Sequence, residues 1–305
     1  MILQCVVCVG HLPGPRLLIT AGVHGDEFEP MAAVQSLADE LRDKNDKIRG
    51  SVTLIPIVNQ SAYLLGSRTA EDELDLARTC PGDSEGSVTQ RIAAALSEAI
   101  RAADYYIDLH TGGSRLRLTP LTGYMLHADP MVLAKQREMA VAFDLPIIWG
   151  TSAELEGRSL SVARDAGIPA IYAEHGGGGS FDRTVVEDYR RGCMQVMGHL
   201  GMIDSPPVSS SVTYQIEDGR SGSGHLQVCH PAPRNGLFVP RVQVGQMIRQ
   251  GEVLGEFLDL ANRDNSPIVA EQGGLVLMLH TAPHVRQGTG LAVVLELDQR
   301  QSQLP

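Results

Sequence analysis

The sequence predicts an α/β fold with a mixed central sheet and helices on both of its faces, followed by a small all-β domain. Strand-like and helix-like segments alternate over the first two-thirds of the chain, which is typical of α/β folds. Amphipathic helix patterns then stop near residue 204. The composition agrees, because 43% apolar residues support a sizeable core and 32 glycines suit many tight turns.

Each element of the first two-thirds follows from its own pattern. Short apolar runs that end in glycine or polar residues predict buried strands, and apolar residues three and four positions apart predict helices. The expected strands are 3–10, 16–23, 51–59, 105–111, 145–150 and 168–179. The expected helices are 29–44, 88–103, 130–143, 159–167 and 182–200.

The last third has a different pattern. Residues 204–212 are rich in proline and serine, which predicts a linker. Short β-rich pieces punctuated by glycine follow at 236–259 and 266–280, and they predict a rigid sandwich or barrel. We therefore expect two domains, at 1–204 and 205–305.

Charge and hydropathy narrow the function classes. The formal net charge of −11 argues against nucleic acid or an anionic membrane as the main partner. No basic segment followed by a long apolar run marks a signal peptide, and no apolar stretch reaches about 18 residues. We expect a cytoplasmic protein.

Polar residues at the ends of the expected strands form a candidate metal site. His24 and Glu27 follow strand 16–23, and Gly25 is expected to make a sharp turn that lets both side chains reach one point. His110 ends strand 105–111 and precedes Thr-Gly-Gly. Two histidines and one glutamate leave a fourth position for water, as catalytic zinc sites require. Taken one at a time, the pair also fits ordinary loop residues, and His110 also fits a hydrogen-bonded structural histidine.

Carboxylates near the same strand ends are candidates for supporting roles. Glu174 ends an apolar strand, where a carboxylate is costly unless it is used or paired. It is either a general base that takes a proton from water or a helix cap. Asp108 shares a strand face with His110 and either orients it or caps a loop. His175 points to the opposite face, so we expect a structural role for it.

Two arginines lie in the long polar segment 66–83. Arg68 and Arg78 suit a polarised carbonyl and a substrate carboxylate, because guanidinium groups bind oxygen anions. The acidic residues 71–75 of this segment fit a solvated surface loop.

Four motifs together resemble a known family. GVHGDE, DELDLAR followed by PGD, IDLHTGG and AEHGGGG occur in this order, and the set resembles the succinylglutamate desuccinylase/aspartoacylase family. The resemblance covers about residues 10–200 and implies a zinc carboxypeptidase-like fold. The pattern at 240–255 resembles the β domain of bacterial members, which is similar to lipoyl and biotinyl carrier domains. No lysine follows Lys135, so the attachment lysine of a carrier is missing.

The resemblance implies roles for individual residues. It assigns one zinc ion per chain to His24, Glu27 and His110. Glu174 falls on the general base that activates water. Arg68 falls on the arginine that polarises the scissile carbonyl, Arg78 on the one that holds the substrate carboxylate, and Arg158 loosely on a further substrate-side arginine. The family usually has Asn-Arg where this chain has Ala77-Arg78.

The leading hypothesis is a zinc-dependent amidohydrolase that removes an N-acyl group from a small amino acid or related amine. Bacterial members with the same β domain include deacylases of acetylated diaminobutyrate, which is one substrate candidate among several. A metallocarboxypeptidase for small peptides and a non-catalytic metabolite-binding protein of the same fold are the alternatives. A homo-oligomer that uses the β domain for contacts also stays open.

Overall fold

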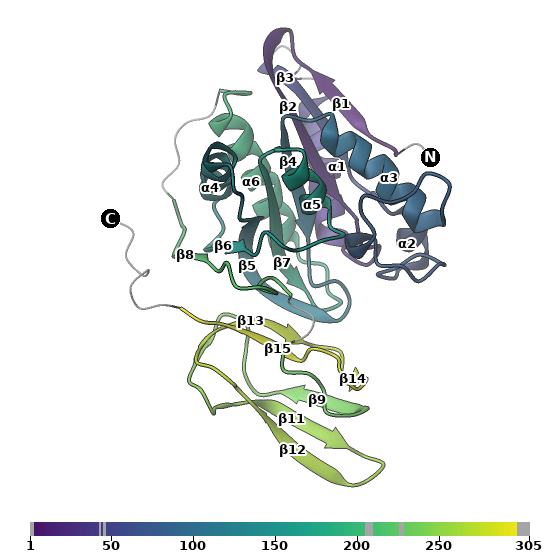
Figure 1. The fold of residues 1–305 in the computed structure, drawn as a ribbon, viewed down its shortest axis with the longest axis vertical. Coiled ribbons are helices and arrows are strands. Elements are labelled where there is room, and N and C mark those ends of the chain that lie inside the picture. Colours follow the sequence, from purple (N-terminus) through teal and green to yellow (C-terminus); the bar gives the residue numbers. More distant parts are fainter. Residues whose placement is uncertain (1–2, 43, 45–46, 205–209, 226–228, 298–305) are drawn as a thin grey trace.

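The computed structural model describes residues 3–42, 44, 47–204, 210–225 and 229–297. It confirms the predicted fold class, with a large mixed sheet, flanking helices and a separate antiparallel sheet in the C-terminal region (Figure 1). The strands of the first two-thirds are β1 Val6–Val9, β2 Leu12–Ala21, β3 Arg49–Ile55, β4 Tyr105–His110, β5 Leu116–Met125, β6 Ile147–Thr151 and β7 Ala170–Gly177. The helices are α1 Phe28–Leu41, α2 Gln60–Leu65, a short 3₁₀ helix Leu76–Arg78, α3 Val88–Arg101, α4 Pro130–Phe143, α5 Ser159–Asp165 and α6 Arg183–His199.

Several helices begin where the sequence supplies a capping side chain. The Ser87 side chain accepts a hydrogen bond from the Gln90 N–H, and the Gln90 side chain returns one to the backbone of Ser87, which starts α3. Asp129 caps α4, whose first residue is Pro130. Asp182 caps α6 in the same way. The local sequence therefore sets these three starts.

The central sheet brings the carboxyl ends of four parallel strands to one edge. β2 pairs in parallel with β3 and with β4, and β4 pairs in parallel with β7. β5 lies antiparallel on the other side of β7. Side chains that follow β2 and end β4 therefore lie at the same edge, which is where α/β sheets form clefts.

Helices cover both faces of this sheet, as the apolar strand sequences predicted. Leu18 and Ile19 are neighbours in β2, yet they belong to different buried clusters. The cluster with Ile19 includes Leu37 of α1 and Tyr189 of α6, and the cluster with Leu18 includes Leu96 of α3. Because successive strand residues point to opposite faces, the two clusters are the two cores on either side of the sheet.

Several elements lie outside the segments expected from the sequence, among them the 3₁₀ helix Leu76–Arg78 and the strands after residue 280. α2 and β5 were not expected, and β8 Tyr214–Glu217 follows a segment expected to be a linker. β5 contains Pro120, and its pairing with β7 shifts register between Leu118 and Leu121. A proline and a bulge interrupt the alternation that identifies a strand. Of the expected linker 204–212, residues 205–209 lie outside the described residues.

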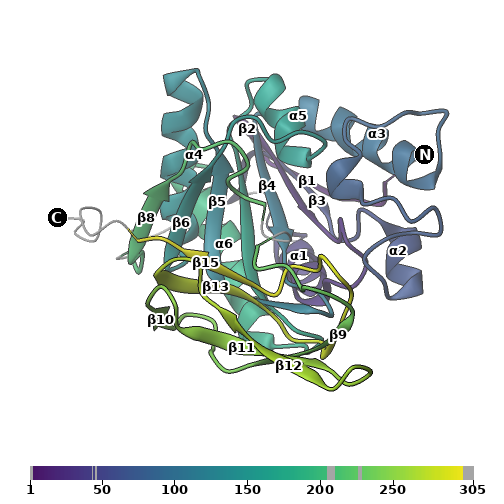
Figure 2. The same cartoon turned by 60° about the horizontal axis from the view of Figure 1, so that its bottom comes forward.

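The C-terminal strands form a second sheet and also extend the first. The remaining strands are β9 Gly236–Pro240, β10 Met247–Ile248, β11 Val253–Asp259, β12 Asp264–Val269, β13 Gly274–His280, β14 His284–Val285 and β15 Ala292–Leu295. The order β12-β11-β9-β14 makes the second sheet, while β13 pairs with β5 and carries β10 and β15 (Figure 2). β8 pairs in parallel with β6. The C-terminal region is thus joined to the central sheet at two strands, and the division at 204/205 stays a prediction.

No helix within the described ranges is long and apolar enough to cross a membrane.

Candidate metal centre and active site

The loop between β2 and α1 holds His24 and Glu27. Its turn is made by Gly22, which has a φ of 67°, and not by Gly25 as the sequence suggested. Gly25 is needed for a different reason. A Cβ added there would lie 2.0 Å from the carbonyl carbon of Ala62 in α2, so only glycine lets the loop pack against that helix.

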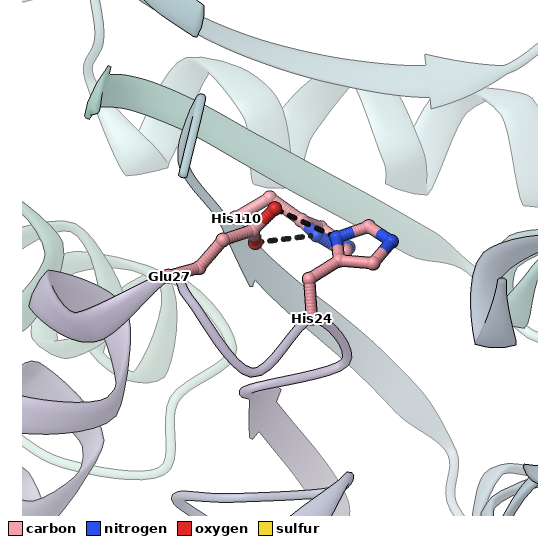
Figure 3. Close-up of side chains that lie close together, drawn as sticks. All are labelled: His24, Glu27 and His110. Carbon is pink, nitrogen blue, oxygen red and sulfur yellow. Dashed lines mark hydrogen bonds and ion pairs between the residues drawn. The ribbon is translucent and has the colours of Figure 1, made fainter. Parts of the chain in front are cut away.

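His24, Glu27 and His110 converge on one point (Figure 3). Glu27 lies between the two rings, with Oε1 2.6 Å from His24 Nδ1 and Oε2 3.0 Å from His110 Nδ1. One ligand atom from each residue lies within 4.8 Å of the others, and all three residues are buried. Two imidazole nitrogens and a carboxylate oxygen are the donor set of a divalent transition metal.

The contacts of the two histidine Nε2 atoms also favour a metal site. His24 Nε2 lies 3.1 Å from Asp75 Oδ1, and His110 Nε2 lies 3.2 Å from Asp108 Oδ2. A ring that donates its Nε2–H to a carboxylate keeps the Nδ1 lone pair free, which is the usual arrangement behind a metal-binding histidine. The residues present therefore fit a bound metal, with both histidines binding through Nδ1.

Asp75 is a site residue that the sequence analysis overlooked. It was counted among the solvated acids 71–75, but its Oδ2 accepts hydrogen bonds from Arg68 Nε at 3.2 Å and from the outer Arg68 amino group at 3.0 Å. Burial acts to raise the pKa of Asp75, but the hydrogen bond with His24 and the charge of Arg68 outweigh it and hold this pKa well below its usual range. Its place in the DLAR motif, three residues before Arg78, was the available signal.

Asp108 is fully buried under the cluster. Besides His110, it accepts a hydrogen bond from the Thr20 hydroxyl at 2.7 Å and a short one from the Ser159 hydroxyl. These contacts hold its carboxylate in one orientation. Asp108 therefore contacts a proposed metal ligand and does not cap a loop.

Glu174 lies beside the cluster, within β7 and not at its end. It is in register with His110 of β4, so both side chains leave the same face of the sheet. Its Oε2 is buried and lacks a hydrogen-bond partner among the described residues, and burial raises the pKa of Glu174 to about 8. The next residue, His175, points away and lies 3.2 Å from Asp188 of α6. A carboxyl group whose pKa lies near neutral pH, beside three candidate metal ligands, is suited to proton transfer.

A small cavity opens over these groups. Its volume is about 80 Å³, and its lining includes the two histidines, Glu174 and three arginines, namely Arg68, Arg78 and Arg158. Arg68 reaches to 3.8 Å from Glu27. Burial lowers the pKa of Arg78, and burial followed by the nearby Arg78 lowers that of Arg158.

Arg78 and Arg158 have no carboxylate partner among the described residues. Arg78 donates to the Ala77 carbonyl at 2.8 Å, and Arg158 donates to the Gly224 carbonyl at 3.4 Å. Neither contact neutralises a guanidinium charge. Two half-buried, uncompensated cations in one small cavity are suited to an anionic group of a ligand.

The chain matches characterised proteins over most of its length. Residues 13–200 match the family model described as the succinylglutamate desuccinylase/aspartoacylase catalytic domain. The chain is 29% identical over 291 residues to the N-alpha-acetyl-L-2,4-diaminobutyric acid deacetylase of Halomonas elongata, which covers 93% of this chain and 83% of that protein.

Solved structures agree with this match. A succinylglutamate desuccinylase/aspartoacylase from Rhodobacter sphaeroides superposes with a TM-score of 0.86 at 30% identity, covering 97% of this chain and 90% of that one. The product-bound ectoine utilization protein EutE of Ruegeria pomeroyi gives a TM-score of 0.84 at 25% identity, covering 96% and 89%. The likeness therefore includes the C-terminal strands as well as the region of the family model.

Proposed function

The chain belongs to the succinylglutamate desuccinylase/aspartoacylase family, and from this premise we propose that it is a metal-dependent amidohydrolase. It removes an N-acyl group from a small amino acid or related amine. The observation that carries the proposal is the convergence of His24, Glu27 and His110 within 4.8 Å, where the two histidines and Glu174 line one cavity. The reaction is hydrolysis: water adds across the amide C–N bond and gives a carboxylic acid and a free amine.

The residues in and around the cavity have separate roles in this reaction. His24, Glu27 and His110 hold the metal, with zinc as the expected ion. When bound, a divalent metal supplies Lewis-acid chemistry, which makes water more acidic and polarises a carbonyl. Glu174 takes a proton from the attacking water and passes it to the leaving amine. Its pKa is raised toward the pH of the cell, which suits a group that both accepts and donates a proton.

Arginines stabilise the charges that appear on the substrate. Arg68, which Asp75 holds near Glu27, donates hydrogen bonds to the carbonyl oxygen as negative charge develops there. Arg78 and Arg158 bind a carboxylate on the amine side of the substrate, because neither forms an ion pair with a described residue. The relative from Halomonas elongata is named for acetylated diaminobutyric acid, which carries such a carboxylate, so this compound is a first candidate substrate.

A turnover screen tests the proposal. Zinc-loaded protein is mixed with N-acetyl, N-succinyl and N-formyl amino acids, including acetylated diaminobutyrate, and the released amine is measured with an amine-reactive dye. We expect release of amine from at least one of them and loss of this release in Glu174→Gln. No release from any of them would contradict the proposal. Faster release of the C-terminal residue from small peptides would favour a carboxypeptidase, and tight binding without turnover would favour a metabolite-binding protein.

A further inference from the structure

A second cavity lies next to the first and is much larger. Its volume is about 560 Å³, against about 80 Å³ for the first. Its walls come from the loops 66–69 and 112–116, from Asp26, and from residues of the C-terminal region, namely His280, Thr289 and Gly290. The described linings of the two cavities have one residue in common, Arg68.

The second cavity meets the first at Arg68, and chain neighbours of the proposed metal ligands, though none of the ligands themselves, line it. Asp26 stands between His24 and Glu27 in the chain, and Gly112 follows His110 by two residues. The carbonyl carbon of an amide carries two substituents that diverge by about 120° in one plane. When its oxygen faces Arg68 and the metal cluster, these substituents must leave in different directions. The two cavities that share Arg68 offer two such directions.

The contents of the cavities decide which substituent goes where. The first cavity is small and contains the uncompensated Arg78 and Arg158, which suit the carboxylate of an amino acid. We propose, resting on the proposed function, that the second cavity receives the acyl group, and that it favours an acyl chain longer than acetyl that carries a hydrogen-bond donor. The C-terminal region then contributes directly to substrate choice through His280 and Thr289.

The donor preference follows from the polar atoms of the second cavity. His280 Nδ1 lies 2.8 Å from the Ala282 carbonyl, so this nitrogen carries the hydrogen and Nε2 is left as an acceptor without a partner among the described residues. Burial lowers the pKa of His280, which keeps the ring neutral. Asp26 Oδ2 accepts hydrogen bonds from Ser114 N at 2.9 Å and from Ser114 Oγ at 2.7 Å, while its Oδ1 has no partner in the described chain.

Because Asp26 Oδ1 is fully buried, His280 Nε2 is the acceptor that a substrate can reach. An alkyl chain would cover this nitrogen without bonding to it, whereas a hydroxyl group would donate a hydrogen bond to it. A buried acceptor left without a hydrogen bond costs free energy, so the alkyl acyl chain should bind less well than the hydroxylated one. Arg115 lines the cavity as an exposed side chain, so a chain that ends in a carboxylate is the competing chemistry.

The test compares acyl chains on one amine. Zinc-loaded protein is given the N-acetyl, N-butanoyl, N-(4-hydroxybutanoyl) and N-succinyl derivatives of the amino acid that it deacylates. We expect kcat/KM for the hydroxybutanoyl derivative to exceed that for the butanoyl derivative by about 5- to 10-fold, the value of one neutral hydrogen bond. Equal rates for these two, a clear preference for succinyl, or turnover confined to acetyl would overturn the inference.

Two variants tie the preference to the second cavity. His280→Leu should bring the hydroxybutanoyl to butanoyl ratio close to one. Thr289→Trp fills the cavity without removing a buried group, and it should lower the rates of the butanoyl and hydroxybutanoyl derivatives relative to acetyl by about 10-fold or more. His284→Leu, an exposed histidine of the neighbouring strand β14, is the control and should change neither ratio. If no derivative is hydrolysed at all, the proposed function fails; if acetyl is hydrolysed and the ratios do not respond to the variants, only this inference fails.

Discussion

Replacing Asp75 by asparagine should weaken metal binding although the residue is not a ligand. Its Oδ1 accepts from His24 Nε2 at 3.1 Å and from Ala77 N at 2.9 Å, and its Oδ2 accepts from Arg68 at 3.0 Å. Asparagine has only one oxygen, so its amino group must face a donor on one side or the other. The variant therefore loses either the orientation of His24 or the position of Arg68.

The expected magnitude follows from the role of such outer carboxylates. Loss of the group that orients a metal-binding histidine costs about 10- to 100-fold in metal affinity, which is about 1.4–2.7 kcal/mol. Zinc affinity is measured by competition with a chromogenic chelator, and kcat/KM is measured on the same samples. If the amino group faces Arg68 instead, zinc affinity changes little and kcat/KM falls.

Asp72→Asn is the matched control, three residues earlier in the same loop. Asp72 accepts from the Thr89 backbone at 2.9 Å and the Thr89 hydroxyl at 2.7 Å, at the start of α3 and away from the cluster. Its replacement should cost about 1 kcal/mol of stability and leave zinc affinity unchanged. The reasoning is refuted if Asp75→Asn retains both zinc affinity and kcat/KM, or if the two variants weaken zinc binding equally.

Three further predictions concern catalysis, packing and pH. Glu174→Gln should retain zinc and lose about 10²- to 10⁴-fold in kcat, measured by amine release, and unchanged kcat would place the base elsewhere. Gly25→Ala should cost about 2–3 kcal/mol in urea unfolding because its Cβ would overlap Ala62, whereas Gly66→Ala, at φ 58° in open space, should cost about 1 kcal/mol; equal losses would contradict the packing argument. Burial acts to raise the pKa of Asp72, but hydrogen bonds from its partners outweigh it and lower this pKa. The stability that Asp72 contributes is therefore complete above its unfolded pKa and lost as pH falls through the folded one. The stability difference between the wild type and Asp72→Asn should be constant above about pH 5 and shrink as pH falls further, and a difference that stays constant at low pH would exclude this linkage.

The sequence predicted the strands and helices that have a clear period, and it failed where tertiary contacts override the pattern. The alternation of β2, α1, β3 and α3 could be recognised because the two strands are short apolar runs and the two helices each have one apolar face. β5 was missed because Pro120 and a register shift break its alternation. Pairing of β13 with β5 joins residues more than 150 positions apart, and no local pattern encodes such a contact.

Some residues of the candidate site could be predicted from the sequence, and others could not. His24, Glu27 and His110 could be found because each follows or ends an apolar strand, where polar residues are conspicuous. Asp75 could not be separated from its acidic neighbours, because only the folded loop shows that it points inward to His24. The place of His280 beside the site was out of reach for the same reason, since it depends on how the C-terminal strands pack.

The most direct test of the metal centre is a crystal structure of zinc-loaded protein with diffraction data recorded on both sides of the zinc absorption edge. The account predicts one strong anomalous peak per chain, about 2 Å from His24 Nδ1, His110 Nδ1 and a Glu27 carboxylate oxygen. Glu174 should still line the cavity beside the metal, with its carboxyl group not bound to the ion. A peak bound to other residues, ligation through the Nε2 atoms, or no peak at these three residues in fully loaded protein would contradict the account.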